Sequence, residues 1–87
     1  MKLKSGFVLE EVGGAYIAVA VGANASNALI KMNGTGAFLW RLLDAGNMTE
    51  DSLVQALTEE YEVDENLARR DVSAFVIKLR EAGLLDE

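Results

Sequence analysis

The hydrophobic period of this sequence changes once, at the segment Asn33–Gly36, which reads NGTG. Before it, apolar residues alternate with polar ones or form short runs, a pattern typical of β-strands. After it, apolar residues recur every three or four positions, which predicts amphipathic helices. A chain of 87 residues is too short for a second independent core, so we expect one domain spanning residues 1–87, with strands first and helices after them.

The first part of the pattern predicts a three-stranded antiparallel sheet. The runs Phe7–Val12 and Ala15–Val21 flank Gly13–Gly14, and two glycines accept the positive φ angles of a two-residue hairpin turn. Such a turn sets four pairs opposite each other: Val12 and Ala15, Glu10 and Ile17, Leu9 and Ala18, and Val8 and Val19. A small polar loop at 22–27 leads to the third predicted strand, Ala28–Met32.

Three helices are predicted after the turn, each preceded by a residue type that caps helices well. The expected N-caps are Asn33 or Thr35 for the first helix, Thr49 for the second and Asp64 for the third. Gly83 should end the third helix in a left-handed conformation, with Leu84 folded back onto its last turn. The residues expected on the buried faces are Phe38, Leu39, Leu42, Leu43, Leu53, Val54, Leu57, Tyr61, Leu67, Ala68, Val72, Phe75, Val76, Leu79 and Ala82. Trp40 lies beside the first stripe, where we expect it to pack at the edge of the core, although a tryptophan at a rim can also anchor a partner.

The composition excludes most kinds of catalytic and metal site. The sequence contains no histidine and no cysteine, which removes the usual nucleophile–base pairs, nearly all zinc sites and disulfides. The acidic pairs Glu59–Glu60, Asp64–Glu65 and Asp86–Glu87 fall at helix ends and polar faces, where solvation explains them. We therefore expect no catalytic residue, no metal and no cofactor.

The net charge and the hydropathy limit the possible partners. The chain has 14 acidic and 8 basic residues, and its net charge of −6 opposes binding to nucleic acid and to anionic lipid. No run approaches the roughly 20 apolar residues that cross a bilayer. Glu10 and Glu11 interrupt what would otherwise imitate a signal peptide. We expect a cytoplasmic protein that binds neither nucleic acid nor membranes.

The turn Asn33–Gly36 raises the question of a nucleotide site, because a strand, a glycine turn and a helix together can cradle phosphate. A dinucleotide fingerprint would need a glycine at Leu39, and a P-loop would need a lysine at Ala37. Neither residue is present. The turn is therefore expected to cap the first helix and to let the chain leave the strand sharply.

A basic and apolar border runs along the third predicted helix of this otherwise acidic chain. Arg69, Ser73, Val76 and Arg80 follow one another at helical spacing beside the buried stripe, and Ile77 lies just outside them. Such a border can bind a partner, and it can equally be a solvated face on which the arginines pair with nearby glutamates. The helix alone favours neither interpretation.

Four segments carry a resemblance to a known family. They are the hairpin VLEEVGGAYIAVAVG, the turn MNGTGAFLWRLLD, the helix MTEDSLVQALTEEYEVD and the C-terminal DVSAFVIKLREAGLL. In order and spacing, over nearly the full length, the chain resembles the PqqD-like family, whose members are also called RiPP recognition elements. The residues that fall where such domains have them are Asn33, Thr35, Gly36, Trp40, Tyr61, Phe75 and Gly83. Met32 and Gly34 depart from the family, which more often has leucine and a polar residue at these positions.

The resemblance implies a winged-helix-like α+β domain, with a three-stranded antiparallel sheet followed by three helices and no catalysis of its own. It also implies that the domain binds the leader of a ribosomally made precursor peptide and presents it to a modifying enzyme, often a radical S-adenosylmethionine (radical SAM) protein. The third strand agrees with this, because an edge strand can accept a peptide as an added strand. The expected peptide-binding residues are Leu29, Ile30, Lys31, Met32, Arg69, Ser73, Val76, Ile77 and Arg80.

Two other functions fit the same order of strands and helices. A winged-helix DNA-binding domain would use the basic residues of the third helix, although the net charge opposes it; these residues are Arg69, Arg70, Lys78 and Arg80. A module that scaffolds an enzyme without touching peptide is the other alternative. Both faces of the predicted sheet carry apolar residues and the helices can cover only one. We therefore expect contact with a partner enzyme or with a second copy, as a homodimer at high concentration.

Overall fold

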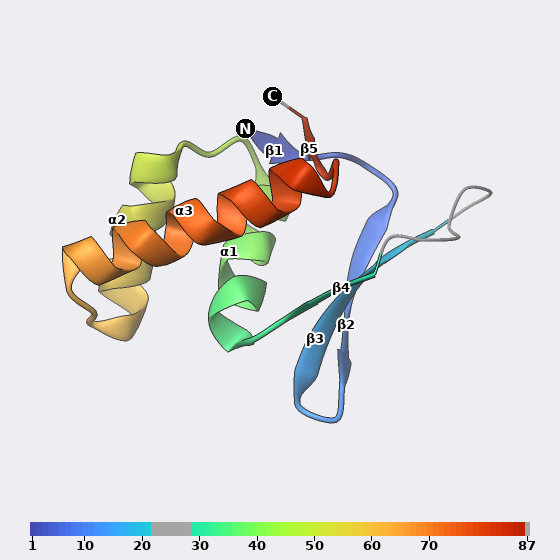
Figure 1. Cartoon of the computed structure of the whole chain (residues 1–87), viewed down its shortest axis with the longest axis horizontal. Coiled ribbons are helices and arrows are strands. Elements are labelled where there is room, and N and C mark those ends of the chain that lie inside the picture. Colours follow the sequence, from blue (N-terminus) through green and yellow to red (C-terminus); the bar gives the residue numbers. More distant parts are fainter. Residues whose placement is uncertain (22–28, 87) are drawn as a thin grey trace.

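The fold places a sheet beside a cluster of three helices (Figure 1). The computed structural model describes residues 1–21 and 29–86. Along the chain, the elements are β1 (Lys2–Leu3), β2 (Phe7–Val12), β3 (Ala15–Ala20), β4 (Leu29–Met32), α1 (Gly34–Ala45), α2 (Glu50–Tyr61), α3 (Glu65–Glu81) and β5 (Leu85–Asp86). Strands β2, β3 and β4 form one antiparallel sheet in that order, and β1 pairs with β5 in a second sheet. The predicted α+β class, with a three-stranded sheet followed by three helices, is confirmed.

The β2–β3 hairpin forms in the register that the glycine pair predicts. Gly13 and Gly14 have φ angles of 58° and 82°, the left-handed values that a two-residue hairpin turn requires. All four expected pairs occur, including Val12 opposite Ala15 next to the turn. The loop predicted at 22–27 lies outside the described residues, as does the first residue of the predicted third strand.

The three N-caps are formed by residues that the sequence predicts. Asn33 caps α1, because its Oδ1 atom accepts a hydrogen bond from the amide of Gly36 at 2.9 Å. Thr49 caps α2 and exchanges hydrogen bonds with Ser52 in a capping box. The carboxylate of Asp64 accepts from two amides in the first turn of α3. These caps satisfy backbone donors that the helices cannot satisfy themselves.

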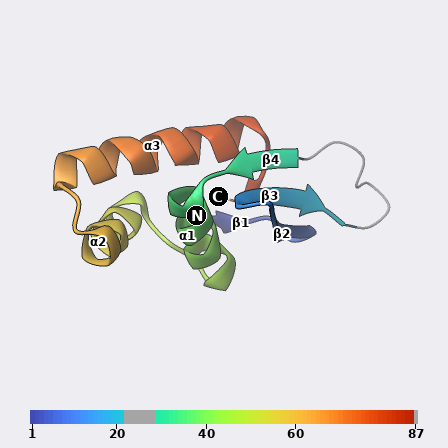
Figure 2. The same ribbon diagram turned by 90° about the horizontal axis from the view of Figure 1, so that it is seen from below.

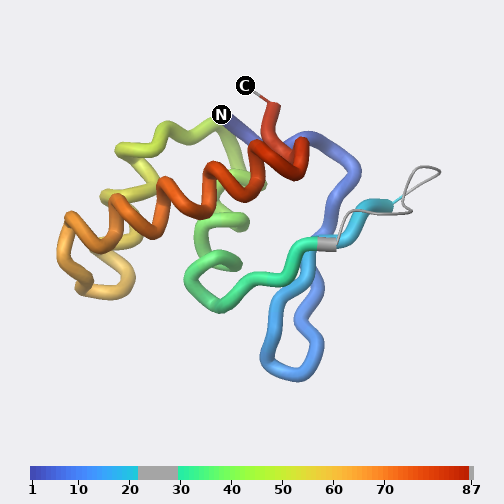
Figure 3. The backbone as a smooth tube through the Cα atoms, viewed as in Figure 1, coloured from blue at the N-terminus to red at the C-terminus, as the bar shows by residue number. Residues whose placement is uncertain are grey.

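The C-terminal end of α3 turns the chain back toward its start. Gly83 has a φ angle of 76°, and the amide of Leu84 donates to the carbonyl of Leu79 at 2.9 Å, as expected for a left-handed helix end. The chain then enters β5, which pairs with β1, so the first and last strands lie side by side (Figure 3). The sequence does not predict this small sheet, because two-residue strands have no hydrophobic period to detect.

The core lies between the helices and the face of the sheet that they cover. Trp40 is only 2% exposed, which confirms that it packs in the core, but it lies within the core rather than at its edge. Tyr61, Leu67 and Ala82 were expected to be buried, yet all three are exposed. They stand at the ends of α2 and α3, where the chain leaves the core; the ring of Tyr61 packs edge-on against Phe38 at 5.5 Å between centroids.

The two faces of the β2–β3–β4 sheet differ in burial. On the inner face, Ala18, Ile30 and Met32 are at most 8% exposed and belong to the core. On the outer face, Val8 and Val12 are 41% and 58% exposed. The helices therefore cover one face, and the other face keeps apolar side chains in contact with solvent.

Candidate functional site

Strand β4 forms one edge of the sheet, and its register determines which backbone groups face outward. The two-residue turn makes Val12 and Ala15 a hydrogen-bonded pair, so the backbone of Ala15 faces β2 and that of Tyr16 faces β4. Tyr16 lies opposite Met32, whose N–H and C=O groups therefore point into the sheet. Because these directions alternate along a strand, the N–H and C=O groups of Lys31 lie on the outer edge.

A contact from α3 supports this direction independently. The Nζ atom of Lys78 donates a hydrogen bond to the carbonyl oxygen of Lys31 at 2.9 Å. Helix α3 runs alongside β4 at this point (Figure 2). By the same alternation, the backbone groups of Leu29 also face outward. The outer edge of β4 thus faces the border of α3 that carries Lys78, and no strand within the described ranges pairs with it.

Two hollows lie between β4, the start of α1 and α3. The larger has a volume of about 470 Å³ and is lined by Gly14, Ala15, Lys31, Met32, Asn33, Gly36, Phe75 and Lys78. The smaller has a volume of about 220 Å³ and is lined by Asn33, Thr35, Gly36, Leu39, Asp71, Ala74 and Phe75. They share three lining residues and therefore adjoin each other. Together they form a groove along the edge of the sheet, the β4–α3 groove.

Gly36 allows α1 to start close to both walls of this groove. A Cβ atom at Gly36 would lie 2.9 Å from the Cβ of Met32 and 3.4 Å from the Cε1 of Phe75. Its amide also donates to the Asn33 side chain that caps α1. The NGTG turn therefore positions the first helix against the strand and the third helix, as the sequence predicts.

The predicted site residues of β4 differ in the exposure of their side chains and in the direction of their backbone groups. Lys31 is exposed, whereas the side chains of Ile30 and Met32 are each 8% exposed and pack into the core. The amide of Ile30 points into the sheet toward Ala18, its partner on β3, so it is not available to an added strand. On the outer edge, β4 offers the backbone of Leu29 and Lys31.

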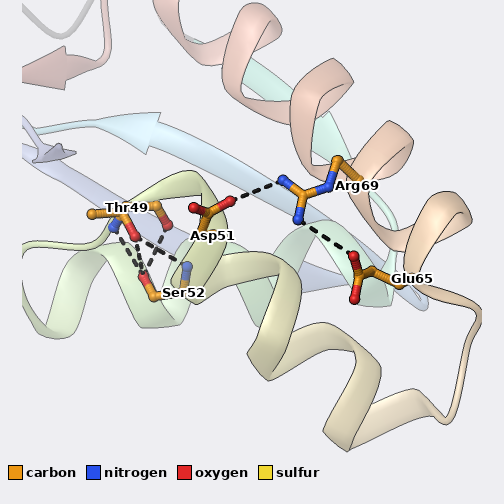
Figure 4. A network of polar contacts seen from close by, with 5 residues as sticks. All are labelled: Thr49, Asp51, Ser52, Glu65 and Arg69. Carbon is orange, nitrogen blue, oxygen red and sulfur yellow. Dashed lines mark hydrogen bonds and ion pairs between the residues drawn. The ribbon is translucent and has the colours of Figure 1, made fainter.

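The structure turns Arg69 away from the groove and toward α2 (Figure 4). Its Nη1 atom donates to Oδ1 of Asp51 at 2.9 Å, and its Nη2 atom lies 3.7 Å from Oε2 of Glu65. The hydrogen bond to Asp51, with the charges of both carboxylates, raises the pKa of Arg69 above its usual value. Arg69 and Lys78 are nine positions apart (78 − 69), or about two and a half helical turns, which places them on opposite sides of α3.

None of the other predicted residues of α3 lines either hollow of the groove. Ser73 and Ile77 follow Arg69 at four-residue steps, and Arg80 follows it after about three turns. Val76 is 0% exposed and belongs to the core. These residues therefore lie outside the β4–α3 groove, because the helix presents its opposite border to the sheet, and their part in peptide binding stays a prediction. The residues of α3 that line the groove are Asp71, Ala74, Phe75 and Lys78.

The groove provides backbone groups, apolar walls, two lysines and the carboxylate of Asp71. Within residues 1–21 and 29–86, no three histidine, cysteine, aspartate or glutamate side chains are grouped so that they could hold a metal ion. In the same part of the chain, no helix is both long enough and apolar enough to cross a bilayer. The arrangement suits recognition of an extended chain through its backbone.

Comparisons with known proteins agree with this architecture. The sequence model of the family described as coenzyme PQQ synthesis protein D (PqqD) matches residues 7–85. No curated protein matches the sequence significantly. The solved structure of TbiB1 in complex with the TbiA(beta) leader peptide matches with a TM-score of 0.77 and 23% sequence identity, over 99% of this chain and 95% of that chain. At this level of identity, the match shows that the two proteins share a fold.

Proposed function

The chain belongs to the family of coenzyme PQQ synthesis protein D (PqqD), as the sequence resemblance predicts, and we propose that it binds the leader of a ribosomally synthesised precursor peptide. In this proposal it is a non-catalytic peptide chaperone, a RiPP recognition element, that presents the peptide to a modifying enzyme of the radical SAM class. The observation that carries the proposal is the outer edge of β4, which faces the β4–α3 groove. The solved structure of TbiB1, which has a similar fold, contains a leader peptide, and this supports the proposal that the present chain also binds one.

An extended peptide fits this edge as an additional antiparallel strand. Its backbone would exchange hydrogen bonds with Leu29 and Lys31, which gives affinity with little demand on the peptide sequence. Alternate side chains of the peptide would point into the groove, toward Ala74 and Phe75 of α3. The main chain would thus supply affinity, and the border of α3 that carries Lys78 would select the leader.

The direct test is a titration with synthetic leader segments, taken from short precursor genes that lie beside the gene for this chain. Amide chemical shifts should change most at residues 29–32 and along the groove side of α3. Shifts confined to the β2–β3 hairpin would contradict the proposal. If the modifying enzyme bound this protein while leaders caused no shift along β4, a scaffold that does not touch peptide would be the better description.

Two exposed positions of α3 provide a matched pair of variants for the location of the peptide. Ala74 lines the smaller hollow of the groove, whereas Ile77 is 50% exposed and lines neither hollow. Ala74→Glu should weaken leader binding by about 1–3 kcal/mol, or roughly five- to hundredfold, because it places a charge against the peptide. Ile77→Glu should leave the affinity unchanged. Glutamate suits helices, so both variants should fold; a loss in Ile77→Glu alone would place the peptide on the border of Arg69.

The DNA-binding alternative has less support, because the basic residues of α3 are engaged within the chain. Arg69 is ion-paired with Asp51, and Arg70 lies 4.0 Å from Asp71. Lys78 donates to a backbone carbonyl of β4. The net charge of −6 adds repulsion from the phosphate backbone. A salt-dependent shift of duplex DNA at micromolar protein would restore this alternative.

A further inference from the structure

Lys78 occupies a hydrogen-bond position that an added strand needs. Its Nζ atom donates to the carbonyl oxygen of Lys31 at 2.9 Å, and this oxygen is one of the acceptors on the outer edge of β4. A peptide that extends the sheet must offer a backbone N–H to the same oxygen. Among the ion pairs of the described residues, none involves Lys78. The ammonium group is therefore balanced by a carbonyl dipole and solvent rather than by a carboxylate.

This contact can be exchanged at low cost. Lys78 and Lys31 are both exposed, so water competes for the hydrogen bond between the ammonium group and the carbonyl. Lysines at sheet edges also discourage pairing with unrelated chains, because a strand that docks there must displace or neutralise the charge. The bond can therefore protect the edge while the groove is empty and still yield to a specific peptide.

The surroundings of Lys78 determine what its ammonium group would meet after displacement. The larger hollow is lined by two lysines, Lys31 and Lys78, and by no acidic residue. Met32 and Phe75 add apolar surface to the same wall. The acidic Asp71 lines the smaller hollow instead. A carboxylate on a short aliphatic stem, as in aspartate or glutamate, fits this combination of charge and apolar surface.

We propose that Lys78 is a displaceable cap of the β4 edge that selects an acidic residue in the leader. In the empty protein it holds the carbonyl of Lys31. On binding, that oxygen accepts a hydrogen bond from a peptide amide, and the released ammonium group pairs with an aspartate or glutamate side chain of the peptide in the larger hollow. This inference rests on the proposed function and adds the class of side chain that one position of the leader must carry.

The test uses a displayed library of random linear peptides, selected separately on the wild-type protein and on three variants. Lys78→Met removes the charge but keeps a long side chain with good helix propensity. Lys78→Arg keeps the charge, and Arg70→Met removes a charge from another exposed position of α3, where the Arg70 side chain is 76% exposed. Selected peptides are retained when they shift the amides of β4 in the wild-type protein.

Aspartate or glutamate should be enriched at one peptide position with wild type, Lys78→Arg and Arg70→Met, and this enrichment should disappear with Lys78→Met. Changing the selected acidic residue to its amide should weaken binding to wild type roughly three- to tenfold and leave binding to Lys78→Met unchanged. The same preference on Lys78→Met would overturn the inference and leave the proposed function standing. If no peptide shifted β4 in the wild-type protein, both would be overturned.

The cap can also be tested without any peptide. The carbonyl carbon chemical shift of Lys31 reports on the hydrogen bond that its oxygen accepts. We expect this shift to change in Lys78→Met and to stay the same in Arg70→Met. An unchanged shift in Lys78→Met would mean that the cap does not form in solution, which would overturn the inference directly.

Discussion

At Gly36, the first turn of α1 meets the end of β4 and the middle of α3, and a single methyl group would change all three contacts. The nearest atom to a Cβ at this position is the Cβ of Met32, at 2.9 Å. A Cβ atom is fixed to its backbone, so it cannot swing away as the end of a long side chain can. Relief would require α1 to move from the strand, and the floor of the β4–α3 groove would move with it.

We predict that Gly36→Ala lowers the free energy of unfolding by about 1–3 kcal/mol, because it overpacks the contact with Met32. Gly34→Ala is the matched control in the same turn, where nothing lies within 4 Å of an added Cβ. It should be neutral or stabilise by up to about 1 kcal/mol, since alanine favours helix more than glycine. Denaturant unfolding measures both variants. Equal stabilities would contradict the close approach at Gly36.

Single residues could be predicted from the sequence where the cause of their role is local. Thr49 and Asp64 were expected to cap their helices because the amides that they satisfy lie two or three positions ahead. The reason for Gly36 could not be predicted, because it depends on Phe75 in another helix. Trp40 was misplaced at the edge of the core for a similar reason, since its burial depends on all the elements around α1.

At the scale of elements, α3 has one buried stripe and two borders, and only one border meets β4. Helical spacing predicted the buried stripe correctly between Ala68 and Leu79, but it does not distinguish the border on one side of the stripe from the border on the other. Charge does not distinguish them either, because Arg69 lies on one border and Lys78 on the other. The neighbouring elements determine which border faces the sheet. Helix α2 lies on one side of α3, where Asp51 pairs with Arg69, and β4 lies on the other side, where the carbonyl of Lys31 accepts from Lys78. This arrangement depends on tertiary packing, so the sequence alone could not predict which border of α3 meets β4.

Strand β4 allows a test of backbone direction with two neighbouring proline variants. Lys31→Pro removes an outward N–H, which edge strands tolerate, so the fold should persist. Leader affinity should fall by about 0.5–1.5 kcal/mol, or roughly two- to tenfold, because one peptide acceptor loses its donor. Ile30→Pro removes an inward N–H and a buried side chain, so it should cost about 2–5 kcal/mol of folding stability.

Thermal unfolding and leader titration together separate these two effects. The expected pattern is a stable Lys31→Pro protein with weakened binding and a destabilised Ile30→Pro protein. The reverse pattern would mean that the outward and inward positions of β4 have been exchanged. Such an exchange would also remove the geometric basis for the contact between Lys78 and Lys31.

The whole molecule has a second exposed region, on the face of the β2–β3–β4 sheet that the helices leave uncovered. Val8 and Val12 are 41% and 58% exposed there, and Ile17 and Val19 lie partly exposed on the neighbouring strand. This face belongs mainly to β2 and β3, whereas a leader would bind along the outer edge of β4. A modifying enzyme on this face and a leader at the edge could therefore be held at the same time, which is what presentation of a peptide requires.

We predict that the double variant Val8→Lys with Val12→Lys weakens association with the modifying enzyme, and self-association at high concentration, by roughly tenfold or more, because lysines replace apolar contacts on the sheet. Leader affinity should not change, since both positions lie on β2, away from the groove. Light scattering over a concentration series measures self-association, a titration with the modifying enzyme measures that association, and a leader titration measures leader affinity. Ile77→Lys, an exposed apolar position on α3, is the matched control and should affect neither form of association. Two results together would show that this face is not an interface. The wild-type protein would remain monomeric at millimolar concentration, and the enzyme would bind the double variant as tightly as wild type.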